Sequence, residues 1–125
     1  MKVKEIMNKV IAIEHNISLR EAAKIMSKKN IGSLVILKKD KIVGIITEKD
    51  IVDNASSLDK KVSSFIKDNI ITVDANDSLE NAACLMSKYK IKRLPVLEND
   101  KLVGIITATD LLAHSEEIET DFFFD

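Results

Sequence analysis

The chain has 125 residues, of which 46% are hydrophobic and 31% charged, and its formal net charge is −1. This composition is typical of a globular protein and lacks the basic excess that neutralises nucleic-acid phosphates, so a nucleic-acid partner is not expected. No apolar run is long enough to span a membrane, and the charged N-terminus does not resemble a signal peptide. A lone cysteine, Cys84, cannot form an intrachain disulfide. It indicates a reducing compartment, which we expect to be the cytoplasm.

The first half of the chain alternates strand-like and helix-like segments. A short extended segment is predicted at Val10–Ile13, and a helix is predicted to begin at Ser18, which forms an S-x-x-E capping-box pattern with Glu21. Two β-rich runs, "SLVIL" and "KIVGIIT", flank a charged connector, residues 38–40, that suits a hairpin turn. A second helix is predicted to follow Thr47.

The second half repeats this order. Residues 17–52 align without a gap onto residues 77–112, and eighteen of the 36 paired positions are identical. An extended segment is predicted at Ile70–Val73, a helix from Ser78, a hairpin around residues 98–100, and a last helix after Thr107. With one residue inserted, Val3 also pairs with Val62. The chain is therefore interpreted as a tandem duplication, with repeats at 1–60 and 61–125.

The predicted fold class is α+β, with one β-α-β-β-α unit in each repeat. Each repeat alone is small for an independent hydrophobic core, so we expect the two copies to close on one another about an approximate two-fold axis.

Each repeat contains the motif "GIIT-x-x-D" at the end of a strand, and two interpretations of it remain open. Thr47 and Thr107 can be helix N-caps, with Asp50 and Asp110 as favourable charges in the first helical turn. Alternatively, the helix start can hold a phosphate while the Asp accepts hydrogen bonds from a ribose diol. On the second interpretation, the glycine of the motif would permit a close backbone approach.

Both repeats resemble cystathionine-β-synthase (CBS) domains, and the pair resembles a Bateman module. The matching stretches are "VIAIEHNISLREAAKIM", "IGSLVIL" and "GIITEKD" in one copy and "IITVDANDSLENAACLM", "IKRLPVL" and "GIITATD" in the other. The resemblance implies two repeats packed sheet to sheet with pseudo-two-fold symmetry and two clefts between them. It also implies a regulatory module, without catalysis and without a required cofactor, that binds AMP, ADP, ATP or S-adenosylmethionine.

The resemblance implies equivalent ligand-binding residues in the two repeats. The Asp residues take the ribose hydroxyls, the Thr residues contact ribose or phosphate, and the remaining residues line or flank the base. The residues assigned to the first cleft are Val10, Ile11, Ile31, Gly32, Ser33, Thr47 and Asp50. Those assigned to the second are Ile70, Ile71, Ile91, Lys92, Arg93, Pro95, Thr107, Thr109 and Asp110.

The two clefts are not expected to be equivalent. Lys92 and Arg93 replace Gly32 and Ser33, so the second cleft is expected to hold phosphate more firmly. Pro95 gives the "LPV" form that is usual in the family, whereas the first repeat has "LVI".

Other chemically active residues have simple interpretations. Cys84 is predicted to face solvent, and His15 and His114 lack the spacing of metal ligands. The run Phe122–Phe124 is expected to pack on the module or on a second subunit, with partner binding as the alternative.

The hypothesis that follows is a nucleotide-sensing module that forms a homodimer and acts on a regulated protein. A ligand-free dimerisation or scaffolding module is the alternative. An enzyme is disfavoured because no nucleophile–base set or metal cluster is apparent in the sequence.

Overall fold

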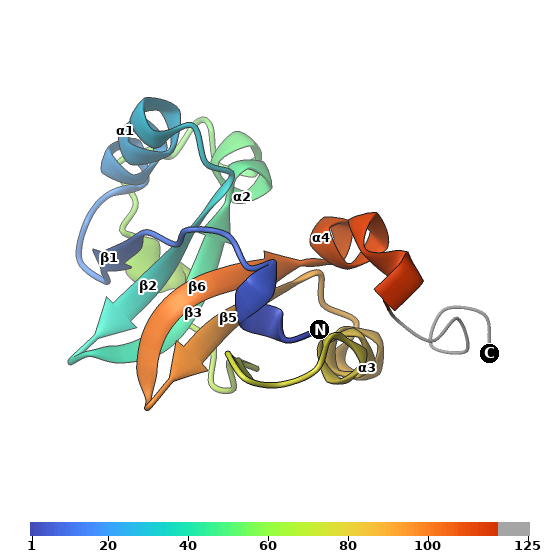
Figure 1. The fold of residues 1–125 in the computed structure, drawn as a ribbon. Helices are drawn as coiled ribbons and strands as arrows, with labels where there is room; N and C mark the ends of the chain where they lie inside the picture. The colour runs from blue at the N-terminus through green and yellow to red at the C-terminus, as the bar shows by residue number, and fades with distance from the viewer. Residues whose placement is uncertain (118–125) are drawn as a thin grey trace. The chain divides into compact units, whose positions relative to one another are not determined.

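The computed structural model describes residues 1–117 and has the mixed α+β architecture that the repeats predict (Figure 1). It divides into two compact units. We call Ile11–Ile70 the first-repeat unit, and Met1–Val10 together with Ile71–Asp125 the second-repeat unit. Each unit contains one three-stranded sheet with two α-helices, which confirms the β-α-β-β-α order.

In both units the sheet has the same topology. Its first and second strands are parallel, and its second and third strands form an antiparallel hairpin. The first-repeat unit consists of β1 (Ala12–Glu14), α1 (Leu19–Lys29), β2 (Ser33–Lys38), β3 (Lys41–Thr47), α2 (Glu48–Asp53) and the 3-10 turn η2 (Val62–Phe65). The second-repeat unit consists of the 3-10 turn η1 (Val3–Glu5), β4 (Val73–Asp74), α3 (Leu79–Tyr89), β5 (Arg93–Glu98), β6 (Lys101–Thr107), α4 (Ala108–Ala113) and η3 (Ser115–Glu117).

The long helices begin where their serines predict. The Oγ atoms of Ser18 and Ser78 accept the backbone N–H of the residue three positions later, each at 3.1 Å. Both helices end at a residue in the left-handed conformation, Asn30 and Lys90. Asn tolerates this conformation better than Lys does, so the two helix ends differ in local strain although their geometry is the same.

The hairpin turns are one residue shorter than the charged connectors predicted. Lys38 pairs with Lys41 and Glu98 pairs with Lys101, so only two residues form each turn. Both turn residues have positive φ angles, 50° and 64° for Lys39 and Asp40. Turns of this kind continue the right-handed twist of the flanking strands, which is why two-residue hairpins adopt them.

The first strand of each sheet begins later than predicted. Extended segments were expected from Val10 and Ile70, but β1 starts at Ala12 and β4 only at Val73. In the first repeat the Val35 N–H donates to the Ile11 carbonyl at 3.0 Å. Pro95 occupies the equivalent position and has no N–H to donate, which explains why β4 is the shorter strand.

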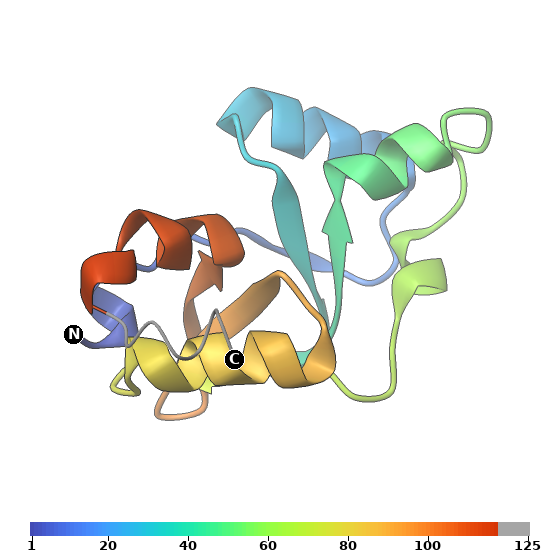
Figure 2. The same ribbon diagram turned by 90° about the vertical axis from the view of Figure 1, so that its right-hand side faces the viewer.

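The first residues of each repeat pack into the core of the unit that holds the rest of the other repeat. Val3 is fully buried in the core that contains Val73 and Leu79, and Val62 is fully buried in the core that contains Leu19. Figures 1 and 2 show the blue η1 turn within the second-repeat unit. The compact units therefore do not coincide with the repeats 1–60 and 61–125. The predicted pairing of Val3 with Val62 is confirmed by their equivalent burial.

The glycine of each "GIIT" motif lies against this leading segment. A Cβ placed on Gly44 would lie 2.7 Å from the Phe65 carbonyl oxygen, and one on Gly104 would lie 2.6 Å from the Met7 sulfur and 3.0 Å from the Asn8 carbonyl oxygen. The close approach that the glycine was expected to offer a ligand is made by the chain itself.

No helix within residues 1–117 is long and apolar enough to cross a membrane. The expected packing of Phe122–Phe124 concerns residues outside the described range. The sheet-to-sheet packing of the repeats stays a prediction.

Candidate functional site

The hairpin register places the candidate residues of the first repeat at one end of its sheet. Ser33, the first residue of β2, pairs with Thr47, the last residue of β3. The Glu48 N–H then donates to the Gly32 carbonyl at 3.1 Å. The loop that enters β2 and the start of α2 are therefore adjacent, as the resemblance implied for Gly32, Ser33, Thr47 and Asp50.

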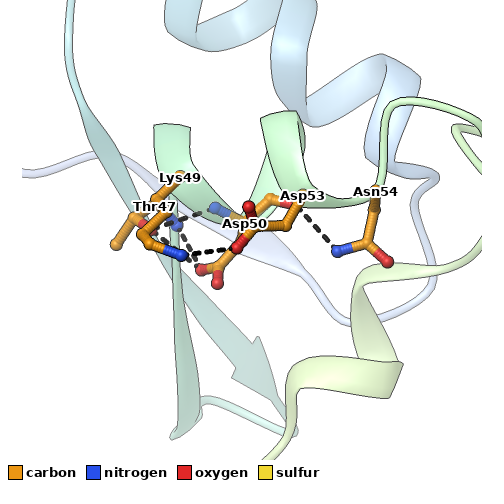
Figure 3. Close-up of polar contacts among 5 residues, drawn as sticks. All are labelled: Thr47, Lys49, Asp50, Asp53 and Asn54. Carbon is orange, nitrogen blue, oxygen red and sulfur yellow. Dashed lines mark hydrogen bonds and ion pairs between the residues drawn. The ribbon is translucent and has the colours of Figure 1, made fainter.

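Thr47 and Asp50 form a complete capping box. The Asp50 Oδ2 atom accepts the Thr47 backbone N–H at 2.8 Å and the Thr47 hydroxyl at 3.0 Å, while the Asp50 N–H donates to Thr47 Oγ1 (Figure 3). The second carboxylate oxygen, Oδ1, accepts no hydrogen bond from the residues that the structure describes. Capping therefore occupies one oxygen of Asp50 and leaves the other for a hydroxyl donor.

The neighbouring lysine forms its ion pair with Asp53 and not with Asp50. Lys49 Nζ forms an ion pair with Asp53 Oδ2 at 2.7 Å, one helical turn further along α2 (Figure 3). The hydrogen bond to Asp53 and its negative charge, with a smaller contribution from Asp50, raise the pKa of Lys49. Both partners are largely exposed, so this pair contributes little to stability. Its effect is to direct the lysine charge toward Asp53.

The second repeat builds the same box with one addition. Asp110 Oδ2 accepts the Thr107 N–H and the Thr107 hydroxyl, each at 2.8 Å. The same oxygen also accepts Asn8 Nδ2 at 2.6 Å. Asn8 pairs through its backbone with Ile105, whose N–H and carbonyl both bond to it. The leading segment thus places an amide donor on the candidate ribose-binding carboxylate of the second repeat.

The assigned base-lining residues fall into different environments. Ile11 and Ile31 are half-buried against the core of the first-repeat unit, and Ile71 and Ile91 occupy the same positions in the other unit. Val10 and Ile70 belong to the opposite unit from their neighbours Ile11 and Ile71, because the chain passes between units at these points.

The other assigned residues of the second repeat differ in exposure. Arg93 pairs with Thr107 in the hairpin register, and the Ala108 N–H donates to the Lys92 carbonyl at 2.9 Å. Lys92 and Thr109 are exposed, whereas Pro95 is buried within β5. Pro95 lacks the backbone N–H that the equivalent Val35 donates to the Ile11 carbonyl.

Two residues near the candidate sites were not identified from the sequence. Asn8 lies 102 positions from Asp110, and no local pattern indicates that they meet. Glu48 places its Oε1 3.6 Å from the point where a Cβ of Gly32 would be. The sequence showed that Glu48 is replaced by Ala108 in the second repeat, but only the structure shows that this carboxylate lies over Gly32.

Within residues 1–117, no group of three or more His, Cys, Asp or Glu side chains is arranged to hold a metal ion. Cys84 is exposed, as its alignment with Lys24 predicted. The candidate sites are therefore described by the residues around the two capping boxes.

Comparison with known proteins identifies a family. A model described as "CBS domain" matches residues 3–57 and again residues 62–117. Hypoxic response protein 1 of Mycobacterium tuberculosis is 33% identical over 91% of this chain and 85% of its own length. L-aspartate semialdehyde sulfurtransferase of Methanocaldococcus jannaschii is 38% identical over 87% of this chain. This chain spans only part of two longer curated relatives, 36% of protein MJ1232 of Methanocaldococcus jannaschii and 22% of the sulfurtransferase.

A solved structure gives the same result. The CBS domain pair of protein MJ0100, in complex with 5′-methylthioadenosine and S-adenosyl-L-methionine, superposes with a TM-score of 0.79. It is 36% identical in sequence, and the match covers 93% of this chain and 96% of that chain.

Proposed function

We propose that this chain, which belongs to the CBS domain family and has two copies of the domain in tandem, is a regulatory module that binds adenosyl compounds. The sites are the two sheet ends that carry Thr47 with Asp50 and Thr107 with Asp110. The ligand class includes AMP, ADP, ATP and S-adenosylmethionine, and the role is regulatory rather than catalytic.

One observation carries this proposal. In both repeats the carboxylate caps its helix through Oδ2 alone, and Oδ1 accepts no hydrogen bond from the described residues. A helix cap needs only one acceptor oxygen, so the cap and a ribose hydroxyl do not compete for the same atom. The MJ0100 pair, which is 36% identical, is described with two adenosyl ligands and supports the choice of class.

The proposed setting is the cytoplasm, where a protein with a single exposed cysteine stays reduced. The proposed output is a change in a regulated protein or in a homodimer contact. A ligand can drive such a change only as far as it binds two states of the module with different affinity.

A ligand-free dimerisation or scaffolding module is the second candidate. The capping boxes favour it, because they account for Thr47, Asp50, Thr107 and Asp110 without any ligand. The two candidate functions therefore share the same fold and differ in whether Oδ1 of the aspartates accepts a hydrogen bond from a ligand.

A ligand panel separates the two candidates. Thermal unfolding would be followed with adenosine, 5′-methylthioadenosine, S-adenosylmethionine, AMP and ATP, and with GTP and NAD as comparators. A ligand at a hundred times its Kd stabilises the folded chain by about 2.7 kcal/mol, which raises the unfolding temperature by several degrees. The double variant Asp50→Asn/Asp110→Asn is the control, and the same ligand concentration is expected to shift its unfolding temperature by about half as much as the parent or less. A flat response from the parent chain to every adenosyl compound would refute the proposal and favour the scaffold.

A further inference from the structure

The two candidate sites carry opposite local charge. In the first repeat, Glu48 and Asp50 place two carboxylates at the start of α2. The Glu48 carboxylate extends toward Gly32, where its Oε1 lies 3.6 Å from the point that a Cβ on this glycine would occupy. The nearby cation, Lys49, forms its ion pair with Asp53, and its charge interacts less strongly with Asp50.

The second repeat keeps the aspartate, as Asp110, but changes the charges around it. Ala108 replaces Glu48, so the first residue of α4 has no carboxylate to place near residue 92. Lys92 and Arg93 replace Gly32 and Ser33 at the entry to β5, and within residues 1–117 neither cation forms an ion pair. Arg93 pairs in the strand register with Thr107, which brings a cation to the same sheet end as Asp110.

Glu48 also has a structural role, because an acidic residue in the first helical turn is stabilised by the partial positive charge of the helix end. A glutamate at this position is not required to start the helix, since α4 begins with Ala108 and keeps the same capping box. The carboxylate therefore adds a negative field to the first site that the fold itself does not need.

We propose that these residues divide the ligands between the repeats: the first-repeat site selects adenosyl compounds without a phosphate, neutral or cationic, and the second-repeat site selects adenosine phosphates. This inference rests on the proposed function and deepens it by assigning a ligand class to each site. Glu48 is the determinant that rejects phosphate in the first repeat, and Arg93 with Lys92 attracts it in the second.

Adenosine and AMP are the matched probes, because they share base and ribose and differ only in the phosphate. Calorimetric titration in Asp110→Asn measures the first-repeat site, and titration in Asp50→Asn measures the second. In the first background AMP is expected to bind at least threefold more weakly than adenosine, and in the second at least threefold more tightly.

The determinant itself is tested by adding Glu48→Gln to the Asp110→Asn background. Exposed charges closer than the Debye length, about 10 Å at 0.1 M salt, change the affinity of a dianion by roughly three- to tenfold. Glu48→Gln is therefore expected to tighten AMP by that factor and to leave adenosine unchanged. Glu14→Gln is the control, because Glu14 is an exposed acid of the same unit that pairs with Leu37, toward the hairpin end of the sheet. Arg93→Ser in the Asp50→Asn background is expected to weaken AMP alone, with the exposed Lys101→Ser as its control.

The outcomes distinguish the two proposals. If adenosine and AMP bind with the same affinity ratio at both sites, or if Glu48→Gln shifts both ligands equally, the division of ligands is wrong and the sensing function stands. If the parent chain binds neither compound, the division of ligands is wrong, and the proposed function also fails only if the wider adenosyl panel gives a flat response.

Discussion

Each candidate aspartate caps its helix with one carboxylate oxygen, and the proposed function assigns the other oxygen to a ribose hydroxyl. Asp50 and Asp110 accept both Thr hydrogen bonds on Oδ2. An Asn side chain has one acceptor oxygen, so it can cap the helix or receive a ribose hydroxyl but cannot do both. The substitution by Asn therefore separates the two roles better than a substitution by Ala, which removes both.

For Asp50→Asn and Asp110→Asn we expect a small loss of stability, about 0.3–1 kcal/mol, because a cap oxygen remains and only the charge is lost. Binding is expected to weaken about ten- to a hundredfold at the altered site, since a charge-assisted bond to the ribose is lost. Urea unfolding measures the loss of stability, and calorimetric titration with AMP measures the loss of binding. The calorimetric AMP signal is expected to fall more in Asp110→Asn than in Asp50→Asn. Variants that bind AMP like the parent but unfold more readily would show that the aspartates are only caps.

At the scale of elements, the third strand of each sheet packs directly against the leading segment. A Cβ on Gly44 would lie 2.7 Å from the Phe65 backbone carbonyl oxygen. One on Gly104 would first meet the flexible side chain of Met7, with the backbone carbonyl oxygen of Asn8 further away at 3.0 Å. A clash with backbone requires a strand or turn to shift, while a long thioether can adopt another rotamer. The two repeats therefore tolerate the same substitution differently.

Gly44→Ala is expected to destabilise the protein by about 1–3 kcal/mol, and Gly104→Ala by less, about 1 kcal/mol. Chemical unfolding of the two variants beside the parent checks the order. Gly32→Ala is the control, because its Cβ would meet only the end of the Glu48 side chain at ordinary contact distance. Equal losses at Gly44 and Gly104 would contradict the distinction.

At the scale of the whole molecule, the two repeats exchange their leading segments. The Val3 N–H donates to the Asp77 carbonyl, and the Val62 N–H donates to the Ile17 carbonyl, both at 2.9 Å. A residue at the start of the first repeat therefore stabilises the second repeat, and a residue at the start of the second repeat stabilises the first.

Val3→Ala is expected to speed amide hydrogen exchange at Leu94 and Ile106, in the core that Val3 joins, and to leave Ile36 and Ile46 protected. The removed methyl groups are worth about 2 kcal/mol. Val62→Ala is the mirror control, with the opposite pattern of exchange. Faster exchange at Ile46 in Val3→Ala would show that the leading segment stabilises its own repeat.

Association of two copies of the chain is also a property of the whole molecule. Val52 and Leu112 occupy equivalent positions on α2 and α4 and remain 72% and 62% exposed, so both are accessible to a second copy of the chain. We expect a homodimer at micromolar concentration in light scattering, and we expect Val52→Asp/Leu112→Asp to be monomeric with an unchanged circular dichroism spectrum. Lys28→Asp, at an exposed polar position of α1, is the control and is expected to stay dimeric. A monomeric parent chain, with and without ligand, would rule out this assembly.

The sequence by itself determined the features that depend on local chemistry. The duplication is visible as two matching stretches sixty positions apart. The caps at Ser18 and Thr47 and the presence of the hairpins follow from residues close together in the chain, whose spacing is set by helix and strand geometry. Only the tertiary structure decided that Asn8 bonds to Asp110, that Phe65 covers Gly44 and that Val3 completes the core of the other repeat. These contacts join segments tens of residues apart, and neither hydrophobic periodicity nor capping patterns carry information about which distant surface a segment will cover.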